Sequence, residues 1–424
     1  MCAMSALSAR NCLLLILLFA VEAATGQYKI KQYVQGNTVW LSTIDPDSAD
    51  DSGLEAIGKA IGDARVVMLG EQDHGDAPTY LAKTRLIKYL HERMGFNVLA
   101  FESDFFALNL GWERLSKEEP AIDSFIRADI LPVWTECNTC RELFYSYISG
   151  TYKTDKPLEL AGVDNQLILR YSVSHLAGWL DSMMRDLRLP IVSSPVYSSE
   201  ILPTIDSARW WDRGDSLAMV KRGVWLDTIG AQAARVLKPE DFRMMVIRNL
   251  VALSKEYGGL ENDDRMMVNA ARDIQMGRNL GWLADTRYAG QKIIVWAANW
   301  HIARIAGNFP HWARTLPTMG GEFEQDSVHR REVYTIGFTS IEGKAGRLGG
   351  PVYNVPGPGF LSFERWLWHD LDYAFVDFRP FNRQHPRDAA AFPLSAFGHH
   401  PYWAVWNRVF DGVICIRKMY PCTR

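Results

Sequence analysis

The chain has 424 residues, of which 48% are hydrophobic and 22% are charged, and its formal net charge at pH 7 is -3. This composition excludes an intrinsically disordered chain, because the apolar content is ample for a large core. It also gives no electrostatic reason to expect a nucleic-acid partner, and no basic stripe is present. We therefore expect a folded protein whose partner is a small-molecule substrate.

The first 26 residues have the layout of a signal peptide. Arg10 precedes an unbroken apolar run from Leu13 to Val21, and small residues follow at Ala23, Ala24 and Gly26. The run is shorter than the roughly 20 apolar residues that a membrane-spanning helix needs. We expect cleavage near Gly26, a secreted or periplasmic location, and no stable membrane insertion of the mature chain.

Four cysteines remain after cleavage, namely Cys137, Cys140, Cys415 and Cys422. An oxidising compartment favours structural disulfides, and four cysteines permit three pairings. The spacing of Cys137 and Cys140 also occurs in redox and metal sites. It lacks a second pair of that spacing and a strand-to-helix context, so we favour the disulfide interpretation.

The first elements form a βαβ unit. Apolar side chains on one face predict a helix over residues 54–61, and a short apolar run predicts a buried strand over residues 66–69. After a turn at residues 70–75, helical spacing continues over residues 78–94, and a second strand follows at residues 97–101. Parallel pairing with a right-handed crossover follows from general rules.

Further strands of the same type are predicted at residues 158–161, 292–296, 333–338, 373–377 and 412–416. Residues 167–285 show a mostly helical pattern, and residues 342–359 are rich in glycine and proline, as in a substrate-contacting loop. No linker divides residues 27–424. We predict one α/β domain with three α/β/α layers, a mostly parallel central sheet, and a helical insertion covering the C-terminal strand ends.

Acids and imidazoles follow four of the predicted strands. Ligands of an open parallel sheet bind beyond the carboxyl ends of its strands, so these side chains are expected to meet at one edge. The residues concerned are Glu71 and His74, Glu102 and Asp104, Asp164, and Asn299 and His301.

Histidine beside glutamate suits hydrolysis, because a carboxylate fixes the imidazole tautomer and supports its protonated form. The chain has no Gly-x-Ser-x-Gly nucleophile elbow, so a water-activating histidine is the simpler hypothesis. His74 is the leading base, with Glu71 or Glu102 as its partner. His301 is a second acid/base or an oxyanion donor.

One helix face adds an arginine. Arg265, Asn269, Arg272, Met276 and Asn279 recur at steps of four, three, four and three, which places them on the same face. This face suits the binding of an oxyanion or a substrate carboxylate. A solvated helix face is the alternative, and it fits Arg265 better than it fits Arg272.

These motifs resemble a known family. Residues 70–75, Lys83, residues 95–96 and Glu102 resemble the opening signature of the erythromycin esterase family, and residues 162–164, 272–279 and 296–301 resemble its later segments. The resemblance implies metal-independent ester hydrolysis without a cofactor, with Glu71, His74, Glu102, Arg272 and His301 around the reacting carbonyl. We expect Lys83, Asp104, Asp164, Arg265, Asn279 and Asn299 to contact the substrate.

Two alternatives stay open. His74, His301, Glu71 and Glu102 are also metal-ligand types, although no HExxH or HxH spacing supports a metal site. A non-catalytic ligand-binding or haem/iron-binding module is the rival from another class. Asp104 and Asp164 are also typical of turns and helix N-caps. The pair His399 and His400 is expected to be structural or exposed.

Overall fold

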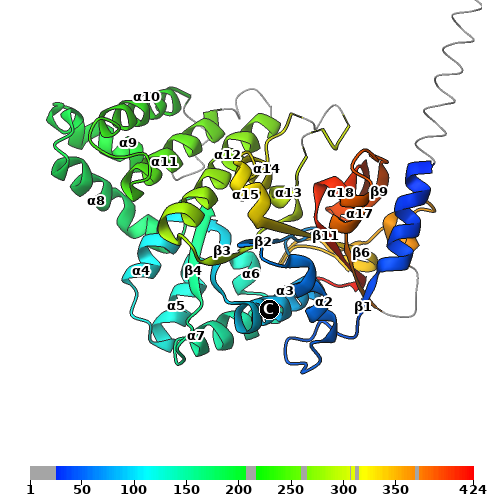
Figure 1. Ribbon diagram of the computed structural model, residues 1–424. Coiled ribbons are helices and arrows are strands. Elements are labelled where there is room, and N and C mark those ends of the chain that lie inside the picture. The colour runs from blue at the N-terminus through cyan, green and yellow to red at the C-terminus, as the bar shows by residue number, and fades with distance from the viewer. Residues whose placement is uncertain (1–24, 207–215, 259–264, 306, 311–314, 368–371) are drawn as a thin grey trace, which may run out of the picture.

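A nine-stranded sheet forms the centre of the computed structural model, which describes residues 25–206, 216–258, 265–305, 307–310, 315–367 and 372–424 (Figure 1). The strand order is β1-β8-β11-β6-β2-β5-β3-β4, and β7 pairs with β6. The six strands from β11 to β4 run parallel, and β8 is antiparallel to β11. The strands are β1 Val39–Leu41, β2 Val66–Leu69, β3 Phe96–Asp104, β4 Glu159–Asp164, β5 Lys292–Trp296, β6 Val333–Ala345, β7 Tyr353–Asn354, β8 Tyr373–Asp377 and β11 Gly412–Met419.

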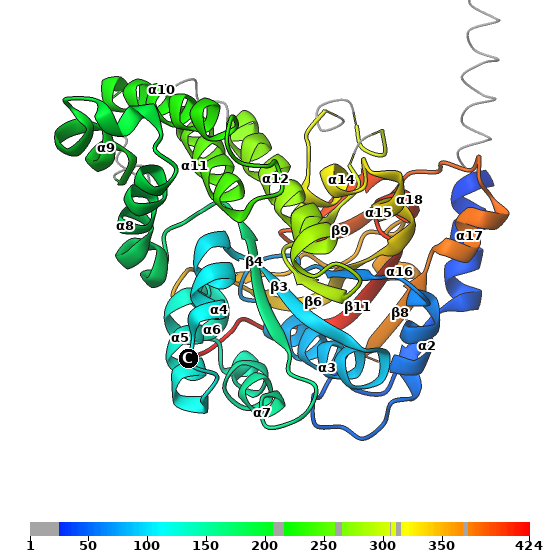
Figure 2. The ribbon, with the colours of Figure 1, turned by 60° about the vertical axis from the view of Figure 1, so that its left-hand side comes forward.

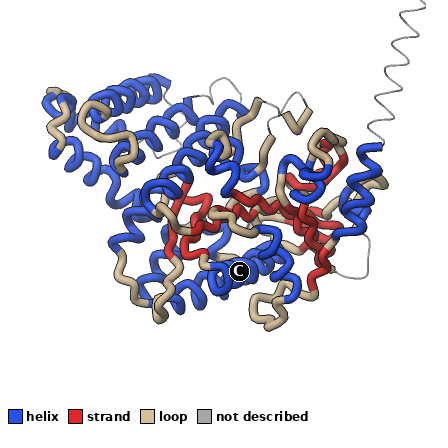
Figure 3. Tube along the Cα trace, viewed as in Figure 1, coloured by secondary structure: helices blue, strands red, loops and turns tan. Residues whose placement is uncertain are grey.

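Helices cover both faces of this sheet (Figure 3). The side chains of β2 show why: Val66 and Met68 enter one hydrophobic core, and Val67 and Leu69 enter the other. Alternate residues of a strand point to opposite faces, so a fully apolar strand needs a cover on each face. The predicted three-layer, mostly parallel α/β fold is confirmed.

The two layers draw on different parts of the chain. One contains α2 (Ser52–Ile61), α3 (Ala77–Met94), α5 (Glu119–Asp129), α6 (Pro132–Thr135) and α7 (Ile148–Thr151). The other contains α12 (Arg265–Trp282), α13 (Asn299–Ile302), α14 (Met319–Phe323), α15 (Ser327–Glu332), α17 (Arg379–Gln384) and α18 (Trp406–Val409). The turn that joins β2 to α3 therefore lies at the strand ends, between the two layers.

In its described residues, the insertion between β4 and β5 consists of helices joined by turns and loops, with no strand. It contains α8 (Arg170–Asp186), α9 (Leu202–Asp206), α10 (Ser216–Ala233), α11 (Phe242–Gly258) and α12. Figures 1 and 2 show α8 to α11 extending beyond the β4 edge of the sheet, whereas α12 returns across the sheet. Contacts of α12 with β4 and α14 bring this helix to the strand ends.

Several predicted boundaries were wrong. β3 runs through Glu102 to Asp104, β4 runs to Asp164, and β6 continues to Ala345, because each strand keeps a hydrogen-bonded neighbour beyond its apolar run. The apolar pattern did not predict β1, β7 or the antiparallel hairpin of β9 (Phe392–Phe397) and β10 (His400–Ala404).

Among the described cysteines, one disulfide is present, and it joins Cys137 to Cys422. Cys140 and Cys415 are free and buried. They lie in the cores on opposite faces of the sheet, so they cannot meet. The preferred disulfide interpretation holds for Cys137 and Cys422, and Cys140 and Cys415 stay reduced.

The expected signal peptide lies outside the described residues up to residue 24, and residues 25–37 are helical. Among the described helices, none combines the length and the apolar character needed to cross a membrane.

Candidate active site

The four strands that carry predicted site residues are adjacent in the sheet, in the order β2-β5-β3-β4. Their carboxyl ends therefore open on the same edge. A cavity of about 990 Å³ lies there. The side chains that line it include His74, Glu102, Arg272 and His301, which come from three strand ends and from α12.

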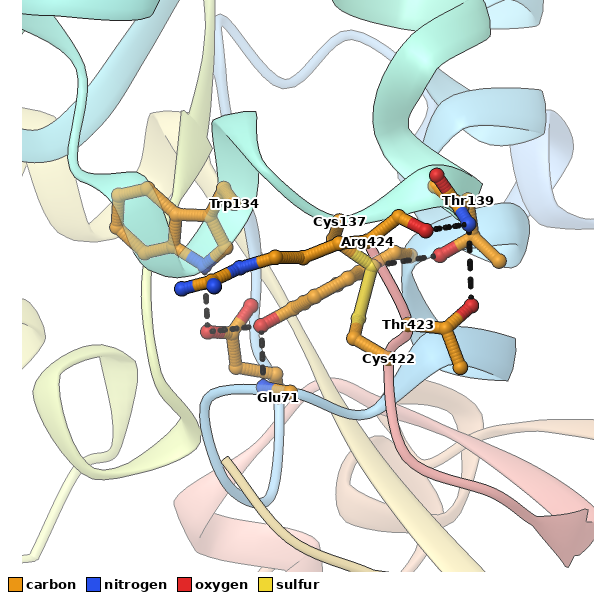
Figure 4. The surroundings of a disulfide bond; sticks show 10 residues. Glu71, Trp134, Cys137, Thr139, Cys422, Thr423 and Arg424 are labelled. Carbon is orange, nitrogen blue, oxygen red and sulfur yellow. Dashed lines mark hydrogen bonds between the residues drawn. A yellow bond between two sulfur atoms is a disulfide. The ribbon is translucent and has the colours of Figure 1, made fainter. Parts of the chain in front are cut away.

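The ring of His74 is oriented by the buried carboxylate of Glu71. Its Nδ1 lies 2.7 Å from Oε1 of Glu71, whose side chain is fully buried. Trp134 on α6 donates its indole Nε1–H to the same Glu71 oxygen at 3.0 Å, and Lys83 on α3 donates to Oε2 at 2.7 Å. Figure 4 shows Glu71 and Trp134 together. The imidazole is therefore oriented with Nε2 toward the cavity.

The charges around His74 favour its protonated form. Burial opposes ionisation of Glu71, but Lys83 and His74 lower the pKa of this carboxyl below its ordinary value. Burial likewise opposes protonation of His74, but the hydrogen bond to Glu71 and the charge of Glu102 raise the pKa of the imidazole. A proton taken up by His74 is thus stabilised by two carboxylates.

Glu102 joins the two sides of the cavity. Its Oε1 lies 3.0 Å from Nε2 of His301 and 4.0 Å from Nε2 of His74. The backbone N–H of Ala298, at the end of β5, donates to Oε2 at 2.9 Å. Burial opposes ionisation, but His301 and Arg272 hold the pKa of Glu102 well below its usual range. Glu102 is therefore a carboxylate between two imidazoles.

His301 and Arg272 provide positive charge opposite His74. Nδ1 of His301 lies 2.7 Å from Asp273, and although burial disfavours the charged ring, Asp273 and Glu102 raise its pKa to about 10. Arg272 donates to Asp164 from Nε at 3.1 Å and from Nη2 at 2.6 Å, and Nη2 also donates to Glu102 at 2.9 Å. Nη1 bonds to none of these carboxylates and lies 3.4 Å from Nε2 of His301, and the side chain lines the cavity.

The other residues that were predicted to contact the substrate lie outside the lining of the cavity or outside the described side chains. Lys83 is fully buried behind Glu71, and Asp164 orients Arg272. Asp104 accepts hydrogen bonds from Ala107, Leu169 and Ser172 and so anchors the start of α8. Asn279 donates to Val163 O and Asn249, and Asn299 donates to Phe338 O and Ala396 O. None of these five lines the cavity, and the side chain of Arg265 lies outside the described part of the structure.

Sequence reasoning missed two residues that position the histidines. Asp273 contacts His301, and its only signal was its place directly after Arg272 on the predicted helix. Trp134 contacts Glu71 from α6, a short helix to which no function was assigned. Apolar cavity residues from distant segments, including Leu316 and Phe397, also carried no local signal.

Among the described residues, no group of three or more His, Cys, Asp or Glu side chains is arranged to hold a metal ion.

The fold and the cavity define an α/β protein with an acid–base site at the ends of parallel strands. Residues 91–419 match the model of the erythromycin esterase family, so the chain belongs to this family and is an esterase-like hydrolase. The match begins after the turn that contains Glu71 and His74.

The chain is similar to a curated protein and to solved structures. The Bacillus subtilis (strain 168) protein named "Putative hydrolase YbfO" is 25% identical over 405 residues, covering 89% of each chain. A Bacillus cereus structure has a TM-score of 0.71 at 18% identity, covering 93% of this chain and 98% of that chain. A histidine-to-asparagine variant of erythromycin esterase EreC, in its open conformation, has a TM-score of 0.70 at 17% identity, covering 91% and 99%. The solved structures share the fold.

Proposed function

We propose that this chain is an exported hydrolase that cleaves an ester or lactone bond of a small or medium-sized organic molecule. The observation that carries the proposal is the pairing of His74 with buried Glu71 at 2.7 Å, across the cavity from Arg272 and His301. A water-activating base and a cationic group for the developing oxyanion are the two elements that hydrolysis requires.

In the proposed reaction, Nε2 of His74 takes a proton from water while the water oxygen attacks the carbonyl carbon. The carbonyl π electrons move to oxygen, and Nη1 of Arg272 and the charge of His301 stabilise this oxyanion. When the tetrahedral intermediate collapses, the bond to the leaving oxygen breaks. His74 returns its proton to that oxygen, which gives a carboxylic acid and an alcohol.

Glu71 and Glu102 serve different steps of this mechanism. Glu71 is fully buried and contacts Nδ1 of His74, so it fixes the tautomer that exposes an Nε2 lone pair. Glu102 lies between His74 and His301, so its charge stabilises both imidazolium rings. Neither carboxylate needs to attack the substrate, and water is the nucleophile.

The cavity suits a substrate of moderate size with apolar surface. Its volume of about 990 Å³ is at the upper end of ordinary ligand pockets. Leu131, Trp300, Leu316 and Phe397 line it beside the charged groups. Macrolactones, acyl sugars and aryl esters are the classes to test first.

The test is hydrolysis of such a panel by the purified mature protein, compared with His74→Asn and with a matched control, His175→Asn. His175 is exposed on α8 and does not line the cavity. We expect turnover that H74N reduces by at least about 100-fold, that H175N leaves unchanged, and that a chelator does not affect. Full activity of H74N would refute the proposed base, and loss of activity with chelator would refute the metal-independent mechanism.

Export is tested separately. Expression of the full chain with analysis of the medium and periplasm should yield a protein whose N-terminus lies near Gln27 by mass spectrometry. An intact N-terminus on a protein confined to the cytoplasm would refute this part of the proposal.

A further inference from the structure

A second cavity, of about 480 Å³, is lined mainly by arginine. It lies among α15, α17 and α18, and it shares no lining residue with the cavity around His74. We call it the arginine pocket, after Arg304, Arg330, Arg331, Arg379, Arg383 and Arg408. Figure 1 shows α15, α17 and α18 on the same side of the sheet.

The carboxylates of this pocket balance only part of its positive charge. The two that line it are Glu324 and Asp411. Asp411 accepts from Arg304 at 2.7 Å and from Arg379 at 2.9 Å, and Glu324 also pairs with Arg304. Two carboxylates are thus occupied by two guanidinium groups in the floor of the pocket.

The other four arginines have no such partner. Arg330 donates to the backbone oxygen of Glu324, and Arg408 donates to the backbone oxygens of His385 and Pro386. Arg331 and Arg383 are exposed, and among the described residues no carboxylate lies within 4.0 Å of the guanidinium of any of these four arginines. The six arginines and two carboxylates that line the pocket thus give it a formal excess of four positive charges, in a chain whose net charge is -3.

Charge alone makes such a hollow attractive to anions, because neighbouring guanidinium groups repel one another until a counter-charge separates them. Guanidinium also matches the geometry of phosphate and carboxylate, with two parallel N–H donors for two oxygens. The ion pairs with Asp411 hold Arg304 and Arg379 in place, whereas Arg331 and Arg383 are exposed.

We propose that the arginine pocket is a binding site for a small diffusible polyanion that carries at least two phosphate or carboxylate groups. Its volume exceeds that of a single inorganic anion, and its charge exceeds what one monoanion neutralises. The site is separate from the hydrolytic cavity, so its occupant is not the ester substrate.

Titration calorimetry with pyrophosphate and with citrate, at constant ionic strength, tests this proposal in the intact mature protein. Constant ionic strength matters because salt screens unspecific attraction. We expect saturable binding of at least one probe, and a melting temperature that rises with its concentration. No saturable binding of either probe would overturn the proposal.

The variant that locates the site is Arg331→Ala with Arg383→Ala, because both side chains are exposed and form none of the ion pairs of the floor. The matched control is Arg114→Ala with Arg235→Ala, which removes the same charge from exposed positions outside the pocket. We expect R331A/R383A to weaken binding at least tenfold and the control to bind like the wild type. Equal weakening in both would mean unspecific attraction and would refute the pocket.

Discussion

Lys83→Met tests whether the buried pair beneath His74 is needed for stability, for catalysis or for both. Nζ of Lys83 lies 2.7 Å from Oε2 of Glu71, and both side chains are fully buried. Oε1 of Glu71 keeps its contacts with His74 and Trp134, but Oε2 has Lys83 as its hydrogen-bond donor. Methionine fills a similar volume without the charge, so packing changes little.

The expected loss of stability follows from the charge of Glu71, which remains buried when Lys83 is removed. Removal of one partner from a buried ion pair costs about 3–5 kcal/mol, because the other charge stays in the interior without compensation. We expect K83M to lower the free energy of unfolding by that amount and to raise the pKa of Glu71. A protonated Glu71 no longer supports the imidazolium of His74, so kcat should fall by about 100-fold.

Urea unfolding and ester hydrolysis measure the two effects, and the double variant K83M/E71Q separates them. Without charge at either position, we expect the double variant to regain most of the lost stability but little activity. Lys88→Met is the matched control on α3, because Lys88 pairs only with partly exposed carboxylates and should cost about 1 kcal/mol or less. A K83M protein as stable as K88M, or a double variant with normal kcat, would refute the reasoning.

Three further predictions follow from the same contacts. A pH profile of kcat/KM should rise through the pKa of His74, at a pH above 6.5, because only the neutral imidazole can take a proton from water. It should fall again through the pKa of His301, near 10, because His301 then loses its charge. A rise centred below pH 6.5 would contradict His74 as the base. Trp134→Phe removes one donor to Glu71 and should lower kcat about tenfold with little change in KM; unchanged kcat would show that this bond is dispensable. Cys137→Ala with Cys422→Ala should lower the free energy of unfolding by about 2–5 kcal/mol in thermal or urea unfolding, and equal stability with and without reductant would refute this.

Most parts of the site that sequence predicted lie at or just after the carboxyl end of a buried strand, and Arg272 was predicted from its place on one face of a helix. Short apolar runs marked β2 and β5 at their observed boundaries, and adjacent parallel strands bring the residues that follow them together. The place of a residue after a strand does not predict whether its side chain points into the cavity or into the protein. Asn299 follows β5 but bonds to the backbone of Phe338 and Ala396, whereas His301 two residues later lines the cavity.

The residues that sequence did not predict act over long separations. Trp134 reaches Glu71 from 63 positions away, and the disulfide joins Cys137 to Cys422 across 285 positions. Figure 4 shows that this disulfide lies beside Trp134 and Glu71. No periodicity or local motif encodes such a contact, because each partner satisfies its own local structure and the pairing arises only in the packed fold.

The turn that contains His74 illustrates why these distant contacts matter. The backbone N–H of Cys422 donates to Gly75 O at 2.7 Å, so the C-terminal tail fixes one end of the turn. From the β9–β10 hairpin, Gly398 donates to Gln72 O at 2.9 Å, and Nε2 of His399 lies 3.0 Å from Asp76.

His399 is fully buried and has a positive φ of 61°, a conformation that costs a non-glycine residue energy unless its surroundings require it. Its ring also contacts Ser340 Oγ at 3.0 Å, and Asp76 accepts a hydrogen bond from the backbone N–H of Asp73. The turn is thus held by the tail on one side and by the hairpin on the other. A base whose nitrogen must meet a water and a carbonyl carbon together gains most from such fixed geometry, because small displacements cost large factors in rate.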